Sequence, residues 1–188
     1  MGRFEDQEGI GSGYVRFLHD YLRVTNPNKN YEIFNRGIGG DRVTNLEERW
    51  QEDVIDLHPE VVSVSIGIND VWRQLDRPDM DQVTPDVFED KLRKLLYEIR
   101  DKQIILMEPT VIEEDLNSEG NRRLREYVEI VRKLSLEFQT VLVPTHQVFL
   151  DYIKEDSGYA LTTDGVHMNS AGNLLMAKTW IKAVEKQS

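Results

Sequence analysis

The stretch Val61-Val62-Ser63-Val64-Ser65-Ile66-Gly67-Ile68-Asn69-Asp70 decides the fold. Its first six residues are rich in β-branched side chains and too few for a helix, which predicts a buried strand. The chain turns at Gly67, and we expect residues 67–84 to form a long loop. Loops of that length in compact domains are often functional. The stretch therefore predicts a core strand whose carboxyl end opens into a functional loop.

Outward from this strand, short apolar runs alternate with helical periods in both directions. We expect further strands at 31–35, 104–107 and 140–143, and helices at about 13–25, 43–57, 85–102, 120–138, 146–153 and 170–184. No linker, repeat or low-complexity segment interrupts them. This pattern predicts a single α/β domain, a doubly wound fold with a largely parallel sheet. Its first helix has no strand before it, because residues 1–9 have no apolar period.

Composition excludes several classes of function. The chain has 188 residues and a net charge of −11, which argues against nucleic acid or an anionic membrane as the main partner. No apolar run is long enough to span a bilayer, and the first 20 residues do not resemble a signal peptide. There is no cysteine, so disulfides, zinc–thiolate sites and thiol nucleophiles are absent.

The segment Thr163-Asp164-Gly165-Val166-His167 places an acid three residues before a histidine in a loop. An acid at that distance can hold one ring nitrogen and leave the other free as a general base. The alternative is that Asp164 merely caps the turn. Of the other histidines, we interpret His19 as a surface or boundary residue and His58 as a helix stop, and His146 opens a short helix.

Two glycine motifs follow predicted strands, at the sheet edge where ligands bind in open α/β folds. Gly37, Gly39 and Gly40 follow the strand at 31–35, where backbone N–H groups can be turned toward a developing oxyanion. A phosphate or dinucleotide loop is the alternative there. Asn69 follows the strand at 61–66, and its side-chain amide is a second donor, although Asn-Asp is also a common turn. We assign Asp70 to that turn.

Together these motifs resemble the SGNH hydrolase family, also called the GDSL esterases and lipases, over nearly the whole chain. The resemblance implies a flavodoxin-like α/β/α sandwich, with Asp164 and His167 as catalytic residues and Gly40 and Asn69 in the oxyanion hole. Met168 stands where the family often has a proline. The resemblance implies no metal and no organic cofactor.

The family's first block, a strand that ends in Gly-Asp-Ser and carries the nucleophile, has no match here. Residues 2–5 look like the stretch just after that block, and no serine of this chain lies on a sharp strand-to-helix turn. We therefore expect the domain 1–188 to be N-terminally incomplete, to lack its first strand and its nucleophile, and to be inactive in this form. We also expect poor solubility or a homo-oligomer.

The resulting hypothesis is a serine ester hydrolase that cleaves a short-chain ester of a small molecule or carbohydrate, without nucleic acid or a membrane span. The loops 71–84 and 109–119 are expected to shape its pocket. The chain reads as cytoplasmic unless an earlier segment carries a signal peptide. Three alternatives remain: a catalytically inactive binding protein on the same fold, a phosphate or flavin binder, and a metal hydrolase that uses Asp164 and His167.

Overall fold

The computed structural model describes residues 8–186, so the stretch at residues 2–5 lies outside the described part. Three parallel strands form its sheet in the order β1-β2-β3, with β1 at Val61–Ser65, β2 at Gln103–Met107 and β3 at Val141–Val143. The register pairs Val61 with Gln103 and Ile105 with Val141. The predicted parallel sheet is confirmed.

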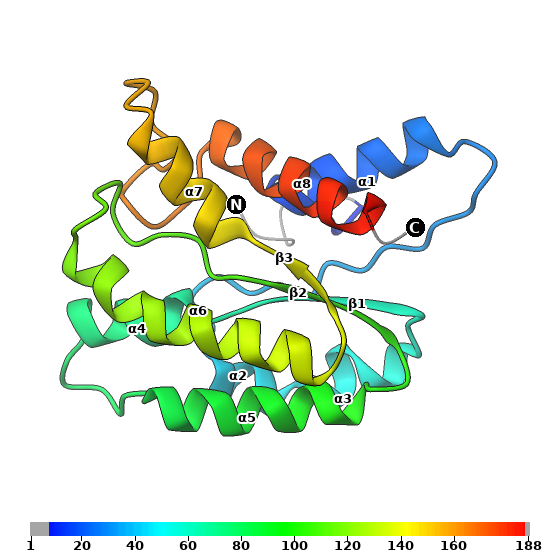
Figure 1. The fold of residues 1–188 in the computed structure, drawn as a ribbon. Coiled ribbons are helices and arrows are strands. Elements are labelled where there is room, and N and C mark those ends of the chain that lie inside the picture. Colours follow the sequence, from blue (N-terminus) through cyan, green and yellow to red (C-terminus); the bar gives the residue numbers. More distant parts are fainter. Residues whose placement is uncertain (1–7, 187–188) are drawn as a thin grey trace.

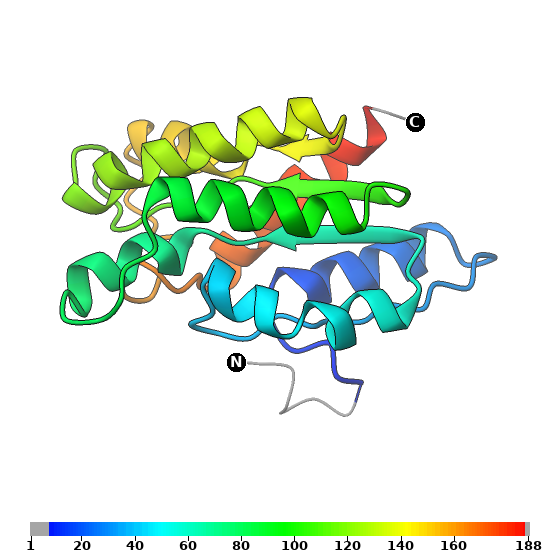
Figure 2. The same cartoon turned by 90° about the horizontal axis from the view of Figure 1, so that it is seen from below.

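Helices cover both faces of this sheet, which makes the fold a three-layer α/β/α sandwich (Figure 1). One face carries α2 (Val43–Glu48), α3 (Trp50–Asp53), α4 (Ile68–Asp76), α5 (Pro85–Glu98) and α6 (Glu119–Glu137), as Figure 2 shows from below. The other carries α1 (Tyr14–Thr25), α7 (Thr145–Lys154) and α8 (Ser170–Glu185). Val62 and Val64 point into the first layer, and Ile105 and Met107 point into the second. The predicted α/β class is thereby confirmed.

Three predicted elements are wrong. Residues 31–35 run extended without forming a strand, because no strand among residues 8–186 lies beside them to complete a ladder. The helix expected over 43–57 is divided into α2, α3 and a 3₁₀ turn at Ile55–Leu57, with non-helical backbone at Arg49 and Val54. The loop expected over 67–84 contains α4, whose spacing of Ile68, Val71 and Leu75 is helical.

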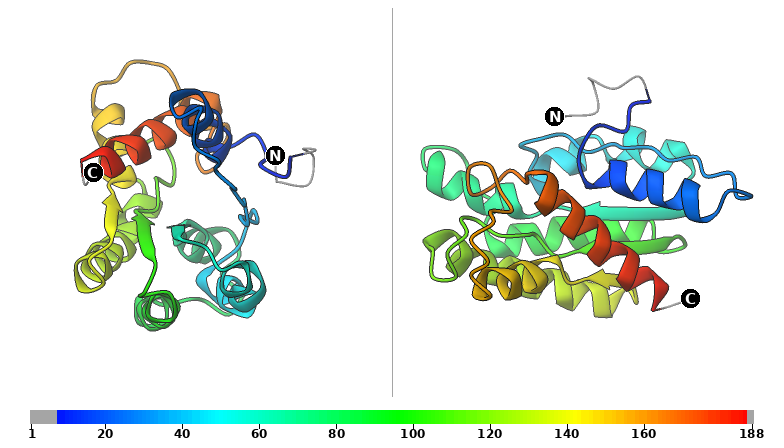
Figure 3. Two further views of the ribbon diagram at one scale, coloured as in Figure 1. Left: turned by 90° about the vertical axis from the view of Figure 1, so that its right-hand side faces the viewer. Right: turned by 90° about the horizontal axis from the view of Figure 1, so that it is seen from above.

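The strand β1 is less buried than the sequence suggests. Val62 and Val64 are buried, but Val61 is 45% exposed, and Ser63 and Ser65 are also exposed. Within residues 8–186 β1 pairs only with β2, so its other edge has no neighbouring strand. Figure 3 shows the extended segment 30–40 passing beyond this edge, from the α1 layer to the α2 layer.

Candidate active site

Asp164 and His167 form a hydrogen-bonded pair on the loop before α8. Nδ1 of His167 lies 2.7 Å from Oδ2 of Asp164. Oδ1 of Asp164 accepts the backbone N–H of His167 at 2.8 Å and that of Val166 at 3.0 Å. The backbone bond from His167, the bond from its ring and the Val166 N–H lower the pKa of Asp164 to about 2. Asp164 is therefore charged at neutral pH, and it orients the ring of His167.

The loop that carries this pair is fixed at both ends. Thr163 N donates to the carbonyl of His167 at 2.8 Å, which closes the loop. Gly165 at its tip has a φ of +91°, in the left-handed region that glycine adopts without strain. Asn169 then caps α8, because its Oδ1 accepts the N–H groups of Ala171 and Gly172. His167 is thus positioned two residues before a capped helix.

The loop 109–119 supports the catalytic loop from the side. The Glu114 carboxylate accepts the backbone N–H of Leu161 at 3.0 Å and the N–H of Thr162 at 2.8 Å. It also accepts the Thr162 hydroxyl at 2.5 Å. The backbone N–H of Glu113 donates to the carbonyl of Gly165 at 2.7 Å. This loop therefore contacts the segment that holds Asp164. The sequence predicted that the same loop shapes a pocket.

Gly40 and Asn69 lie on two turns that are joined to each other. Gly40 has a φ of +89°, and Gly67, which caps α4, has a φ of +115°. Nδ2 of Asn69 donates to the carbonyl of Asp41 at 3.0 Å, one residue beyond Gly40. Within residues 8–186 the Asn69 amide donates no other hydrogen bond, so one of its two hydrogens has no acceptor there.

Asp70 does more than form the turn to which the sequence assigned it. Its side chain is fully buried, and Oδ1 accepts the N–H of Val43 at the start of α2 at 3.0 Å. Burial raises the pKa of Asp70 to about 6, an effect that the Val43 N–H partly offsets. Asp70 thus ties the start of α2 to α4, while its Oδ2 has no partner within residues 8–186.

Two side chains of α4 connect the Gly40 turn to His167. The Trp72 and His167 rings meet edge to face, with centroids 5.5 Å apart. The Arg73 guanidinium lies 4.5 Å over the Trp72 ring. Nη2 of Arg73 lies 3.6 Å from the point where a Cβ on Gly40 would stand. The three sequence motifs therefore meet around α4, although they are more than 120 residues apart at the extremes.

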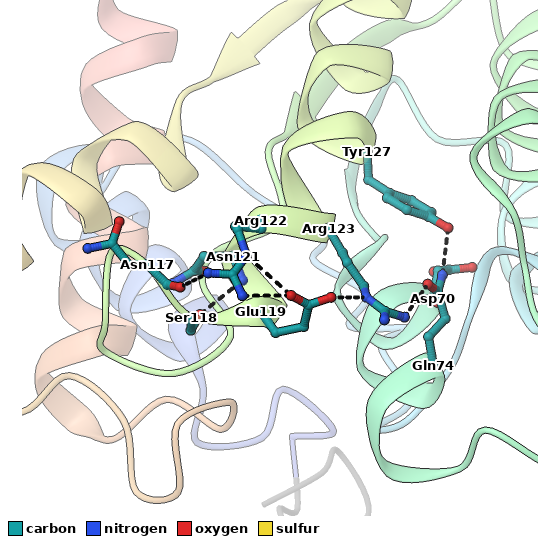
Figure 4. A network of polar contacts seen from close by, with 9 residues as sticks. All are labelled: Asp70, Gln74, Asn117, Ser118, Glu119, Asn121, Arg122, Arg123 and Tyr127. Atoms are coloured by element: carbon teal, nitrogen blue, oxygen red, sulfur yellow. Dashed lines mark hydrogen bonds and ion pairs between the residues drawn. The ribbon is translucent and has the colours of Figure 1, made fainter.

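A polar network holds α4 against α6 (Figure 4). Gln74 donates to the Tyr127 hydroxyl at 2.8 Å and to the carbonyl of Asp70 at 3.0 Å. Arg123, which is paired with Glu119, reaches Oε1 of Gln74 at 3.5 Å. Figure 4 shows these contacts running from the start of α6 to Tyr127, so α6 fixes the helix that carries Asn69 and Trp72.

Comparison with known proteins decides the family. The model of the GDSL-like Lipase/Acylhydrolase family matches residues 5–175. This chain belongs to that family. A relative named acetylxylan esterase, from Geobacillus stearothermophilus, is 36% identical over 179 residues, which cover 93% of this chain and 82% of the relative. This GDSL-type chain therefore falls in the class of carboxylic ester hydrolases.

Solved structures give the same assignment. The structure of Axe2, an acetylxylan esterase from Geobacillus stearothermophilus, superposes with a TM-score of 0.89 at 35% identity, over 97% of this chain and 84% of that one. LAE5, described as an α/β hydrolase enzyme from the metagenome of Lake Arreo in Spain, has a TM-score of 0.89 at 32% identity, over 96% and 84%. Structures described as catalytic mutants of Axe2 replace a serine, an aspartate or a histidine with alanine.

Two of the other histidines of this GDSL-type chain are buried. His19 is buried between Asp20 and Arg23, so its interpretation as a surface or boundary residue is wrong. His146 is buried against the carbonyl of Thr110, and burial lowers its pKa. Within residues 8–186 no serine hydroxyl hydrogen-bonds to His167, and no group of three or more acidic or histidine side chains could hold a metal ion. No helix in the same range is long and apolar enough to cross a bilayer.

Sequence reasoning missed Trp72, Arg73 and Glu114. Trp72 and Arg73 follow the Gly-x-Asn-Asp motif directly, but residues 67–84 were expected to be a loop. Treating them as a helix would have placed both side chains within one turn of Asn69. Glu114 had no such signal, because its partners at 161 and 162 lie 47 and 48 residues away.

Proposed function

We propose that this protein is a serine ester hydrolase that removes short acyl groups, acetyl above all, from a carbohydrate, and that its nucleophilic serine lies outside these 188 residues. His167 takes the proton of the attacking serine and returns it to the leaving alcohol. A water then attacks the acyl-enzyme, again with His167 as base, and releases the carboxylate and the free serine. Asp164 orients His167 and stabilises its charged form.

One observation carries the proposal. The Asp164–His167 pair packs on Trp72, one turn along the helix that begins beside Asn69. This packing brings a candidate general base to the helix that carries Asn69, whose amide, together with the Gly40 N–H, suits an oxyanion. The acetylxylan esterase relative supports the acyl and carbohydrate specificity.

The open edge of β1 supports the proposal that the nucleophilic serine lies outside these 188 residues. Residues 31–35 and β1 both lead to the glycine turns, and neither pairs on the side between them within residues 8–186. A parallel strand inserted there would end at the same edge as Gly40 and Asn69. A serine at its carboxyl end would then face His167.

The test compares two proteins for acetate release from acetylated xylooligosaccharides. One is the chain 1–188, and the other carries the residues encoded before Met1 at its natural locus. We expect release only from the longer protein. Its His167→Gln variant should lose at least 10³-fold in kcat, whereas His58→Asn, at an exposed histidine, should not. Full activity of the chain 1–188 would overturn the external serine, and no release from either protein would overturn the esterase.

An inactive binding protein on the same fold is the second candidate, favoured by the absence of any serine on His167 within residues 8–186. It predicts that the longer protein binds the acetylated oligosaccharide and leaves it intact. Binding without acetate release, measured on one sample by calorimetry and by chromatography of the sugar, would favour it.

A further inference from the structure

Arg73 holds a cationic donor beside the oxyanion turns. Nη1 pairs with Asp76 at 2.5 Å, at the end of the same helix. Nη2 has no partner within residues 8–186, and it lies 3.6 Å from the position of a Cβ on Gly40. The side chain is only 22% exposed, so this donor is partly withdrawn from water. The arrangement leaves one side of the guanidinium fork free toward the Gly40 turn.

Trp72 fixes the orientation of that guanidinium. The guanidinium carbon lies 4.5 Å over the indole ring, a cation–π contact that restrains a long side chain to one plane. The same indole meets the His167 ring at 5.5 Å. The indole therefore contacts both Arg73 and His167 and holds the guanidinium in one orientation, so little side-chain entropy is lost when a ligand binds.

A neutral ester and a carboxylate need different binding groups around Gly40 and His167. The ester carbonyl can be bound by the Gly40 N–H and the Asn69 amide. A carboxylate brings a full negative charge and a second oxygen, and guanidinium groups bind carboxylates preferentially through charge-assisted hydrogen bonds. Asp164 is itself negatively charged, so it offers no attraction to a carboxylate ligand.

We propose that Arg73 is a substrate-site residue that recognises carboxylate, so that this centre binds the short carboxylate released by ester cleavage and is inhibited by it. The inference rests on the proposed function, because it assumes that acyl groups occupy the space between Gly40 and His167. It assigns to α4 a ligand-binding role that neither the glycine motifs nor the dyad supplies.

The test uses the longer protein and two small ligands of similar shape, acetate and neutral acetamide, at constant ionic strength. The ¹⁵N-indole signal of Trp72, assigned with Trp72→Phe, reports binding because this ring touches both Arg73 and His167. Arg73→Gln should weaken acetate about 10-fold or more and acetamide less than 2-fold. Arg73→Lys should restore part of the acetate affinity, because it keeps the charge.

Arg77→Gln is the matched control. Arg77 caps the C-terminus of the same helix, is exposed, and its side chain makes no ion pair within residues 8–186. The control removes the same charge and should leave both affinities unchanged. The inference is overturned if Arg73→Gln leaves acetate binding intact, weakens both ligands equally, or has no larger effect than Arg77→Gln.

A second variant separates this inference from the proposed function. Asn69→Ala should weaken acetate and acetamide alike, because its amide serves any acyl oxygen. Loss of acetate selectivity in Arg73→Gln, together with acetate release by the unsubstituted longer protein, supports both ideas. If Arg73→Gln keeps its preference for acetate over acetamide and the longer protein releases acetate normally, only the role of Arg73 is overturned.

Discussion

Gly165 shows how much one residue determines at the candidate site. The turn between Asp164 and His167 needs a φ of +91°, and a Cβ there would stand 3.3 Å from the Glu113 α-carbon. The tight turn brings the Asp164 carboxylate within hydrogen-bond distance of the His167 ring, three residues along the chain. Backbone conformation at a single position thus controls the geometry of the acid–base pair.

Gly165→Ala should therefore lower the free energy of unfolding by about 1–3 kcal/mol and reduce kcat of the longer protein. Gly158→Ala is the matched control, because Gly158 has a φ of +70° but nothing within 4 Å of its Cβ position. Urea unfolding measures the first effect and acetate release the second. Equal losses in the two variants would show that the contact with Glu113 is unimportant.

Asp70 makes stability depend on pH. Its pKa rises from 3.8 to about 6 on folding, so the folded protein holds a proton that the unfolded chain releases between these values. The contribution of this group to stability is then greatest below pH 4 and is lost as pH rises through 6, by up to about 3 kcal/mol. Asp70→Asn removes this loss and keeps the acceptor for Val43.

We expect Asp70→Asn to raise the free energy of unfolding at pH 8 and to have no such effect at pH 4. Asp79→Asn, at an exposed turn position, should change neither value. Urea titrations at the two pH values decide the matter. A stabilisation that is the same at both would mean that Asp70 is not protonated in the folded state.

Local spacing made Asp164, His167, Gly40 and Asn69 predictable as candidates. Each stands in a short motif beside an element end, where chemistry and geometry follow from a few neighbouring residues. Trp72, Arg73 and the burial of Asp70 were not predictable in the same way, because they depend on contacts between segments that meet only in the folded chain. A lone aromatic or acidic residue in sequence carries no record of such partners.

At the scale of elements, the catalytic loop depends on a neighbouring loop. The Glu114 carboxylate accepts two backbone N–H groups and one hydroxyl from residues 161 and 162. It therefore replaces the partners that a strand or helix would give to this backbone. The loop 109–119 acts as a scaffold, beyond the pocket-shaping role expected of it.

Glu114→Ala should lower kcat of the longer protein about 10-fold or more, because the Asp164 loop loses its anchor. KM should change less, since the Glu114 carboxylate is bonded to residues 161 and 162. Glu114→Gln should retain part of the activity, and Glu113→Gln, at an exposed side chain, should retain all of it. Steady-state kinetics of the three variants test this, and a pure KM effect would contradict it.

The elements that the sequence predicted correctly have neighbours within the described chain or a clear periodicity, and the elements that it missed lack one of these. The strands at 61–66, 104–107 and 140–143 have consistent apolar runs, and β1, β2 and β3 lie where expected. Residues 31–35 have the same local character but no neighbour within the described chain, and a strand exists only as part of a ladder. The helix α4 was predicted as a loop because the acidic and proline residues after Asp76 are typical of loops and its helical period is short.

For the whole molecule, the open edge of β1 is the feature with the largest expected effect. Exposed strand edges with free N–H and C=O groups pair with other chains unless a charge or a cover prevents it. Val61 and Ser65 are exposed on this strand. The net charge of −11 opposes association but does not cover the edge.

We therefore expect the chain 1–188 to self-associate at micromolar concentration, as the sequence suggested. Val61→Lys places a charge on the exposed side of β1 and should reduce association, whereas Val24→Lys, at an exposed position on α1, should not. Sedimentation velocity at several concentrations measures this. A monodisperse monomer at all concentrations would contradict the expectation.

The cap at Asn169 links the position of His167 to the local opening of α8. The N–H groups of Ala171 and Gly172 bond to the side chain of Asn169, two residues after His167. If the first turn of α8 opens, these amides exchange with solvent deuterium, and we expect His167, two residues before the cap, to lose its fixed position as well. The exchange rate of two amides that take no part in the proposed chemistry would then measure how long the proposed base stays in place.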